Sequence, residues 1–297
     1  MRLGATMTIE RKLALQAWIF LALPVLFFCL IRFYPALESF GIAFSEWNLL
    51  SPPKFVGLAN FSRMVEDPVF WIAFRNTFLY LLIGTPFSLL LAFFIAYHLD
   101  QVRFAHGLIR ACYFIPHLTS AVAMAWVWRW FYQPPPVGLF NNLLNSVGLD
   151  TQPFLRSTAQ ALPAVLLPAI WAGLGFQIVL FMAGLRAIPS SYYEAARIDG
   201  AGRWMVLRDI TIPLLRPTIV FLVVISSIGF LRIFDTVFNM TDNGAGGPLN
   251  STKPLVLYIY ESAFRSYQMG YAAAQTIVFF LILLAVSLIQ LRLMRSR

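Results

Sequence analysis

The sequence predicts an all-α membrane protein with six transmembrane helices and a cytoplasmic helical hairpin between the fourth and fifth. Three observations indicate this fold class. Of the 297 residues, 59% are hydrophobic and only 12% are charged, whereas soluble globular domains carry roughly 25% charged residues. The apolar residues gather in long runs, most of which reach the roughly 20 residues that a membrane-spanning helix needs. Many of the few charges gather between two of these runs, from Glu194 to Arg216.

Each apolar run predicts one span. The first run is too long for a signal-peptide core and has no convincing small-residue cleavage site, so we expect it to be retained. The fifth run is short and is expected to borrow residues from both flanks. The six expected spans are residues 13–32, 75–98, 109–130, 159–185, 214–234 and 270–291. One membrane domain then accounts for residues 1–297.

Lysines and arginines predict the orientation, because short cytoplasmic loops of membrane proteins carry an excess of them. With the N-terminus inside, thirteen Lys and Arg lie on the cytoplasmic side and nine on the opposite side. Both termini are therefore expected in the cytoplasm, with longer outer loops at residues 33–74, 129–156 and 232–267. The net charge of +9 comes mostly from arginines at the ends of apolar runs, and the absence of a basic tract argues against nucleic-acid binding.

The sequence points to no chemistry within this chain. His98, His106 and His117 are scattered and have no metal-ligand spacing. Only the fold can decide whether distant residues form a catalytic triad, and we predict no catalytic or metal-ligating residue. No GxxxxGK[ST] segment is present, so we also predict no ATP site. A membrane-embedded transferase, the alternative from another class, would need clustered acids or a His–Asp pair at a membrane face.

The charged segment predicts two short helices joined by a sharp turn. Ser191 and Glu194 have the spacing of a capping box at the start of the first helix. Gly200 suits the positive φ of a chain reversal. A second helix, roughly residues 203–211, is expected to end near Pro213 and lead into the fifth span. The residues alone favour equally a docking surface for another protein and an amphipathic element on lipid headgroups.

The spacing of this segment resembles the EAA loop found in permease subunits of binding-protein-dependent ABC importers. The matching positions are Glu194, Ala195, Ala196, Gly200, Ile210 and Pro213. The longer segment is similar to that of the carbohydrate-uptake group, which is related to the maltose and glycerol-3-phosphate permeases. FVGLANF (residues 55–61) and FDTVFNMTDNGAGGPLNST (residues 234–252) extend the resemblance to nearly the whole chain. One position departs from the pattern, since Ile212 stands where leucine is usual.

The resemblance implies a permease in a bacterial inner membrane that moves a sugar or oligosaccharide delivered by an extracytoplasmic binding protein. Its implied partners are two cytoplasmic ATP-binding subunits, a second homologous permease and the lipid bilayer. ATP and Mg are implied to bind the partner ATPase, with no cofactor on this chain. The implied ATPase-coupling residues are Glu194, Ala195, Ala196, Arg197, Asp199, Gly200, Ile210 and Pro213. Glycerol-3-phosphate or a glycerophosphodiester is the alternative substrate, which the scarcity of cations near the path disfavours.

Small and polar residues in the fourth and fifth spans are candidates for a transport path, because unpaired polar groups are costly in lipid. The candidates are Gly173, Phe176, Gln177, Ser226 and Phe230. The resemblance implies a sugar-contacting surface at comparable depth. Close packing of helices explains the small residues and serines as well, and the two phenylalanines could simply fill the bundle core, so both interpretations stay open. Arg232 and Asp235 have the spacing of an ion pair, either at an outer gate or at the membrane interface.

Overall fold

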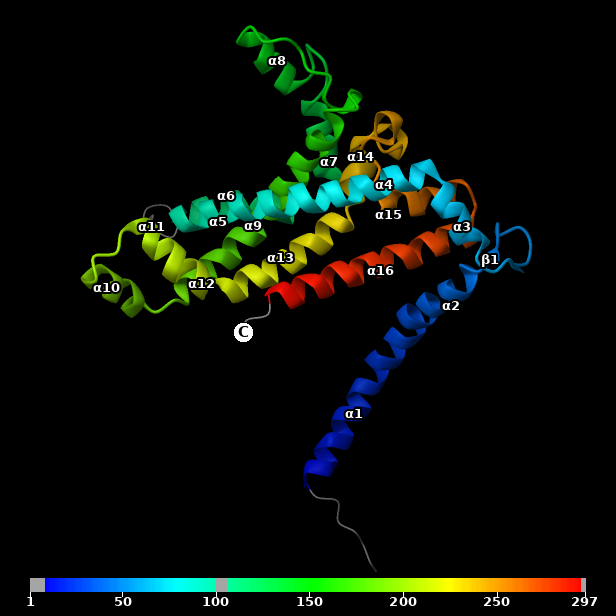
Figure 1. Ribbon diagram of the computed structural model, residues 1–297, viewed down its shortest axis with the longest axis horizontal. Helices are drawn as coiled ribbons and strands as arrows, with labels where there is room; N and C mark the ends of the chain where they lie inside the picture. The colour runs from blue at the N-terminus through cyan, green and yellow to red at the C-terminus, as the bar shows by residue number, and fades with distance from the viewer. Residues whose placement is uncertain (1–8, 100–105, 295–297) are drawn as a thin grey trace, which may run out of the picture. The chain divides into compact units, whose positions relative to one another are not determined.

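The computed structural model describes residues 9–99 and 106–294, and helices make up nearly all of its regular structure (Figure 1). In the described residues, the one sheet pairs two antiparallel strands, β1 (Ser45–Glu46) and β2 (Lys54–Phe55). The chain separates into two compact units, Met1–Met64 with Ser262–Ile277 and Val65–Glu261 with Val278–Arg297. The assignment of residues 1–297 to one domain stays a prediction. The chain ends that are expected in the cytoplasm, residues 1–8 and 295–297, lie outside the described residues.

The first unit begins with a long apolar helix. α1 (Ile9–Phe28) continues through a π-helical turn, Cys29–Phe33, into α2 (Tyr34–Ile42). Arg11–Ile42 is long and apolar enough to cross a membrane, and 0% of its most apolar window is buried. Apolar side chains without protein neighbours suit a helix surrounded by lipid.

The strand pair of the first unit is held by α3 (Ala59–Glu66) and by the start of α16 (Met269–Met294). The Asn60 side-chain amide donates to the Ser45 carbonyl at 3.0 Å. Gly270 approaches the same carbonyl so closely that a Cβ would lie 1.8 Å from its oxygen. A side chain at position 270 would therefore displace the strand from the helix.

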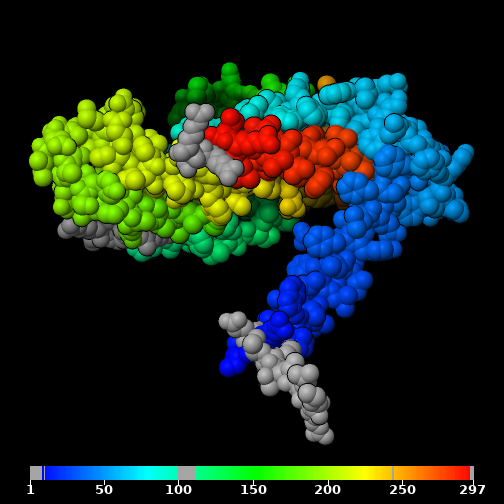
Figure 2. Space-filling model, turned by 60° about the horizontal axis from the view of Figure 1, so that its bottom comes forward, coloured from blue at the N-terminus to red at the C-terminus, as the bar shows by residue number. Residues whose placement is uncertain are grey.

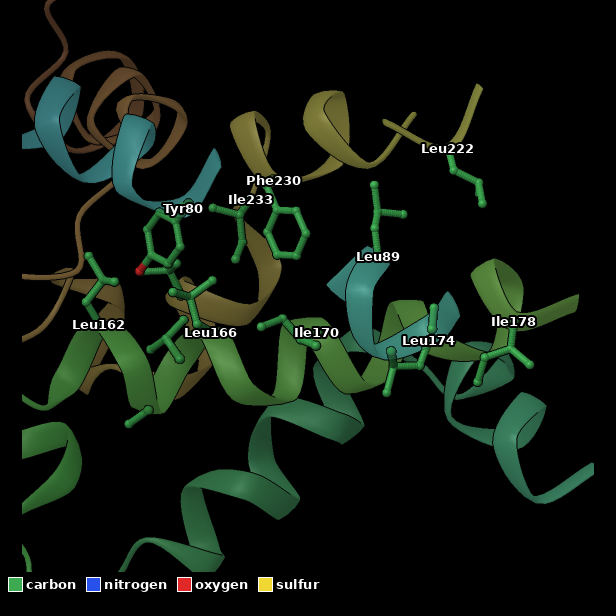
Figure 3. Close-up of a cluster of buried hydrophobic side chains, with 14 of the residues drawn as sticks. Tyr80, Leu89, Leu162, Leu166, Ile170, Leu174, Ile178, Leu222, Phe230 and Ile233 are labelled. Atoms are coloured by element: carbon green, nitrogen blue, oxygen red, sulfur yellow. The ribbon is translucent and has the colours of Figure 1, made fainter. Parts of the chain in front are cut away.

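The second unit is a helical bundle built around α9 (Ala161–Arg186). α4 (Pro68–Leu79), a π-helical turn and α5 (Thr85–Leu99) form one continuous span, and this span packs against α9 and α13 (Arg216–Leu231). The side chains between these helices are mostly aliphatic and aromatic (Figure 3). They include Tyr80, Leu89, Leu166, Ile170, Leu222 and Phe230. Tight van der Waals packing of this kind is what holds helices together in lipid.

Two expected spans are bent. α6 (His106–Leu118) and α7 (Ala121–Phe131) meet at 105°, because Ser120 adopts a ψ of 130° that lies outside the helical region. Arg203–Leu214 meets α13 at 67°, next to Pro217, which lacks the N–H that would continue the helix. Four described helices are long and apolar enough to cross a membrane, and there are up to six if each bent pair is one span. The predicted all-α membrane fold is confirmed.

The second half of α16 lies along α13 within the second unit (Figure 2). There the Gln290 side-chain amide donates to the Ser227 hydroxyl at 2.7 Å. Short helices occupy two of the expected outer loops, with α8 (Leu139–Ser146) in the first and α14 (Asp235–Met240) and α15 (Leu255–Tyr260) in the second.

Polar side chains of the second span hold the segment before α15. The Asn76 amide donates to the carbonyls of Asn250 (2.8 Å) and Lys253 (3.1 Å). The Tyr80 hydroxyl donates to the Thr252 carbonyl at 2.9 Å. The Lys253 ammonium lies 2.6 Å from the Glu261 carboxylate, and these two side chains are only 8% and 13% exposed. The segment is thus fixed by buried polar contacts rather than by apolar packing alone.

Candidate functional site

The five residues predicted for a transport path line one cavity of about 370 Å³ in the second unit. Gly173, Phe176 and Gln177 come from α9, and Ser226 and Phe230 come from α13. The positions 173, 176 and 177 share one face of a helix, as do 226 and 230, because residues three or four apart are neighbours on a helix surface. The end of α6, the start of α7 and residues 232–236, which include the start of α14, complete the wall. Whether these residues contact a solute stays a prediction.

Gln177 is the most polar buried group at this cavity, with 5% of its surface exposed. Its side-chain amide donates to the hydroxyls of Ser226 (3.1 Å) and Ser88 (3.3 Å), so it connects three helices. Its carbonyl oxygen has no hydrogen-bond partner among the described residues. A buried acceptor without a partner costs about 1–3 kcal/mol. The oxygen would therefore gain from a hydroxyl group, of a solute or of water.

The glycines of α9 differ in their surroundings. A Cβ on Gly175 would lie 2.3 Å from the Tyr113 carbonyl oxygen, so Gly175 serves the close approach of α6 to α9. A Cβ on Gly173 would meet only the Gln177 side-chain nitrogen, at 3.5 Å, which is an ordinary contact. Packing therefore explains Gly175, and it leaves Gly173 as open wall of the cavity.

Aromatic rings supply the apolar part of the wall. Phe176 stacks on the imidazole of His117, with ring centroids 5.5 Å apart and an interplanar angle of 20°. Phe230 is 8% exposed, and its ring occupies the space that a Cβ on Gly84 would need. The sequence provided no signal for His117, because a lone histidine without a spacing pattern points to no site.

Arg232 and Asp235 both line the cavity, but they do not form the expected ion pair. Both side chains are exposed, and among the described residues neither is paired with an opposite charge within 4.0 Å. Helical spacing predicted the pair, yet α13 ends at Leu231 and α14 begins only at Asp235. The two residues consequently do not share one continuous helix.

The predicted hairpin is present and turns at Gly200. α10 (Ser190–Ile198) ends in a Schellman motif, in which the Ala201 amide donates to the Ala196 carbonyl (2.9 Å) and the Gly200 amide donates to the Arg197 carbonyl (3.1 Å). Gly200 has a φ of +73°, a backbone conformation that residues other than glycine adopt only at a cost in free energy. The expected capping box is wrong, because the N-cap residue of the helix is Pro189, two residues before Ser191, and no side chain caps this end.

The returning arm is a continuous run, Arg203–Leu214, in which α11 (Arg203–Val206) passes through a π-helical turn into α12 (Ile212–Leu214). Pro213 lies in the first turn of α12, where a missing N–H is tolerated. The bend follows at Leu215 rather than at Pro213 itself.

The two arms enclose a hollow of about 540 Å³. Four predicted coupling residues line it, namely Ala195, Ala196, Asp199 and Ile210. The other four, Glu194, Arg197, Gly200 and Pro213, are exposed outside it. Trp204 and Met205 are also exposed, by 71% and 53%, and they extend an apolar surface over the returning arm.

The pKa of the Asp209 carboxyl, at the hollow, is changed by the neighbouring Arg208. Arg208 donates two hydrogen bonds to Asp209, at 2.7 and 3.1 Å. These bonds lower the pKa of the Asp209 carboxyl below its ordinary value. Both side chains are exposed, so the pair determines the charge at this edge and contributes little to the stability of the arm.

Known proteins are similar to this chain in sequence and in fold. Residues 84–297 match the family described as binding-protein-dependent transport system inner membrane component. The lactose transport system permease protein LacF of Rhizobium radiobacter is 32% identical over 294 residues, 98% of this chain and 97% of that protein. The arabinooligosaccharides transport system permease protein AraP of Bacillus subtilis is 33% identical over 283 residues, 94% of this chain and 88% of that protein.

A solved structure has a similar fold over nearly the whole chain. The crystal structure of a bacterial ABC transporter involved in the import of the acidic polysaccharide alginate contains a chain that matches with a TM-score of 0.81 and 25% identity, covering 97% of this chain and 96% of that one. The chain therefore belongs to the inner membrane components of binding-protein-dependent transport systems and is a permease of an ABC transporter.

Proposed function

We propose that this permease imports a sugar or oligosaccharide that an extracytoplasmic binding protein delivers, with ATP hydrolysed in a separate subunit. The relatives named above are permeases for lactose and for arabinooligosaccharides, which supports a saccharide as the solute. In this proposal the solute crosses the membrane through the cavity between α9 and α13.

The observation that carries the proposal is the carbonyl oxygen of Gln177, a buried acceptor at the cavity with no partner among the described residues. A saccharide offers many hydroxyl donors, and one of them would satisfy this oxygen. Saccharides also have apolar faces formed by their C–H groups, and Phe176 and Phe230 offer rings for such contact. The wall thus combines one strong acceptor with aromatic surface, as small-molecule sites commonly do.

The charges at the cavity favour a neutral solute. Among the described residues that line it, only Arg232 and Asp235 carry full charges, and their opposite signs cancel. Glycerol-3-phosphate or a glycerophosphodiester carries a phosphate that would call for a net positive wall. The alternative substrate is consequently disfavoured for this path.

The hairpin of α10 and α11 is proposed as the contact with the ATPase. Its contact residues would be Glu194, Ala195, Ala196, Arg197, Asp199, Gly200, Ile210 and Pro213. Ala195 and Ala196 are small and line the hollow, so they leave room for a side chain of the partner. The hairpin connects α9 to α13, and a force on it would act on both walls of the cavity.

The proposed assembly contains two ATP-binding subunits, which bind ATP and Mg, and a second homologous permease that completes the pore. The chain itself would bind no cofactor and would have no ATPase site. Both chain termini and the hairpin would face the cytoplasm, and the loops that carry α8 and α14 would face the binding protein.

The test is sugar uptake by the complete transporter with Gln177→Leu. Gln290→Leu is a matched control, because Gln290 also donates to a serine and also has a carbonyl oxygen without a partner in the described part of the chain, but it does not line the cavity. Uptake of a panel of radiolabelled neutral saccharides, lactose included, is expected to fall about tenfold or more in Gln177→Leu and to stay near wild type in Gln290→Leu. Equal uptake by the two variants would refute the path.

A further inference from the structure

A second polar cavity, of about 400 Å³, lies at the C-terminal end of α7 in the second unit. Its lining includes Arg129 and Tyr132 from the end of α7, Arg156 before α9, and Thr241 and Asp242 after α14. None of these residues lines the cavity around Gln177. The second cavity is therefore a separate site.

The charges of the second cavity are unequal. Arg129 forms an ion pair with Asp242, and the side chain of Asp242 is 88% exposed. Arg156 is exposed and has no ion pair with any described carboxylate. The lining thus includes two arginines and one aspartate. Because Asp242 is itself exposed to solvent, its pairing with Arg129 is weakened by water, and a competing anion can displace Asp242 at small cost.

Two packed helices connect the cavities. α7 contributes Ala121 to the cavity around Gln177 and Arg129 to the second cavity. α14, which packs on α7, contributes Asp235 and Met240 in the same order. Ala121 and Arg129 are eight residues apart on α7, which corresponds to roughly 12 Å along the helix. A ligand held by the arginines would thus lie within about two helical turns of the path proposed above.

We propose that the second cavity binds an oxyanion through Arg129 and Arg156, with Asp242 as the internal competitor that occupies Arg129 when no ligand is bound. Guanidinium groups match carboxylate, phosphate and sulfonate groups with paired hydrogen bonds. The oxyanion belongs either to an anionic saccharide or to the phosphate of a lipid headgroup. This site does not depend on the solute path, because binding here is measured without transport.

The experiment measures binding to the purified full-length chain in nanodiscs. Glucuronate, with glucose as the neutral counterpart, is titrated in discs of phosphatidylcholine to test a saccharide source. Retention of phosphatidylglycerol, measured by native mass spectrometry, tests a lipid source. Arg156→Gln removes one guanidinium group and is expected to weaken binding of the probe about tenfold. Asp242→Asn removes the competing carboxylate and is expected to strengthen binding of the probe about threefold.

Lys54→Gln is the control, since it removes an exposed outer-loop cation that does not line the cavity, and it is expected to bind as wild type does. Opposite shifts of the two variants with glucuronate support a saccharide site, and the same shifts with phosphatidylglycerol support a headgroup site. If neither probe shows both shifts, or if glucose binds as well as glucuronate while phosphatidylglycerol shows no shift, the oxyanion site is overturned. Asp242 is exposed, so Asp242→Asn is expected to fold as wild type does, and the test does not depend on a variant that fails to fold.

Discussion

The side-chain amide of Gln177 donates to the hydroxyl of Ser226 across 3.1 Å, and this bond joins α9 to α13 at the wall of the cavity. α9 precedes the hairpin in the chain and α13 follows it. The bond therefore links the two helices to which the hairpin is connected. The same glutamine keeps a carbonyl oxygen without a partner among the described residues. One residue thus serves both the contact between the helices and the polarity of the cavity.

Ser226→Ala tests this relationship. The change removes the acceptor at 3.1 Å and leaves the Gln177 amide with Ser88 alone, at 3.3 Å. Because a lost hydrogen bond is worth about 0.5–1.5 kcal/mol, uptake by the complete transporter is expected to fall severalfold. Ser227→Ala is the matched control, since Ser227 bonds Gln290 outside the cavity. A larger loss of uptake in Ser227→Ala than in Ser226→Ala would contradict the role of Ser226.

Alanine substitutions at Gly173 and Gly175 of α9 distinguish a packing role from a role in the transport path. Gly175→Ala places a Cβ 2.3 Å from the Tyr113 carbonyl oxygen, and overpacking of this kind costs about 1–3 kcal/mol. The thermal unfolding midpoint of the purified protein is therefore expected to drop in Gly175→Ala. Gly173→Ala makes only an ordinary contact at 3.5 Å, so its midpoint is expected to match wild type while its uptake falls. Equal midpoints for the two variants would remove the distinction.

The apolar runs allowed prediction of the helices because a span needs only length and hydropathy. The turn at Gly200 was likewise predictable, because few residues other than glycine adopt a φ of +73°. The 105° bend at Ser120 was not predicted, because the two helices that meet there are, taken together, long and apolar enough for one span. Hydropathy records the environment of a segment and carries no information on its direction.

The candidate cavity was predictable in part. Gly173, Gln177 and Ser226 were candidates because they are small or polar residues within apolar spans, and the structure brings them to one cavity. The difference between Gly173 and Gly175 depends on how close α6 approaches, which only the tertiary structure contains. The missing Arg232–Asp235 pair likewise depends on the folded structure, in which α13 ends at Leu231 and α14 begins at Asp235.

Gly200→Pro tests the hairpin as the coupling element. Proline fixes φ near −65°, whereas Gly200 has a φ of +73°, so the turn between the two arms cannot form. The variant is expected to reach the membrane and to lose ATP-driven uptake while ATP hydrolysis by the assembled transporter continues. Gly202→Ala is the control, because Gly202 has a φ of −71° and no neighbour within 4 Å of an added Cβ. Full uptake by Gly200→Pro would exclude the hairpin as coupling element.

The Lys253–Glu261 pair predicts a stability effect far from the cavity. Both side chains are nearly buried and their charged groups are 2.6 Å apart. Lys253→Met leaves the Glu261 carboxylate buried without the ammonium, and breaking a buried pair costs about 3–5 kcal/mol. The thermal midpoint of the purified protein is expected to fall clearly, whereas Arg208→Gln, which breaks the exposed pair with Asp209, should leave it nearly unchanged. The double change Lys253→Met with Glu261→Leu is expected to recover part of the loss, because apolar side chains of similar size can replace a buried pair. A double variant less stable than Lys253→Met would show that Glu261 stabilises the segment independently of Lys253.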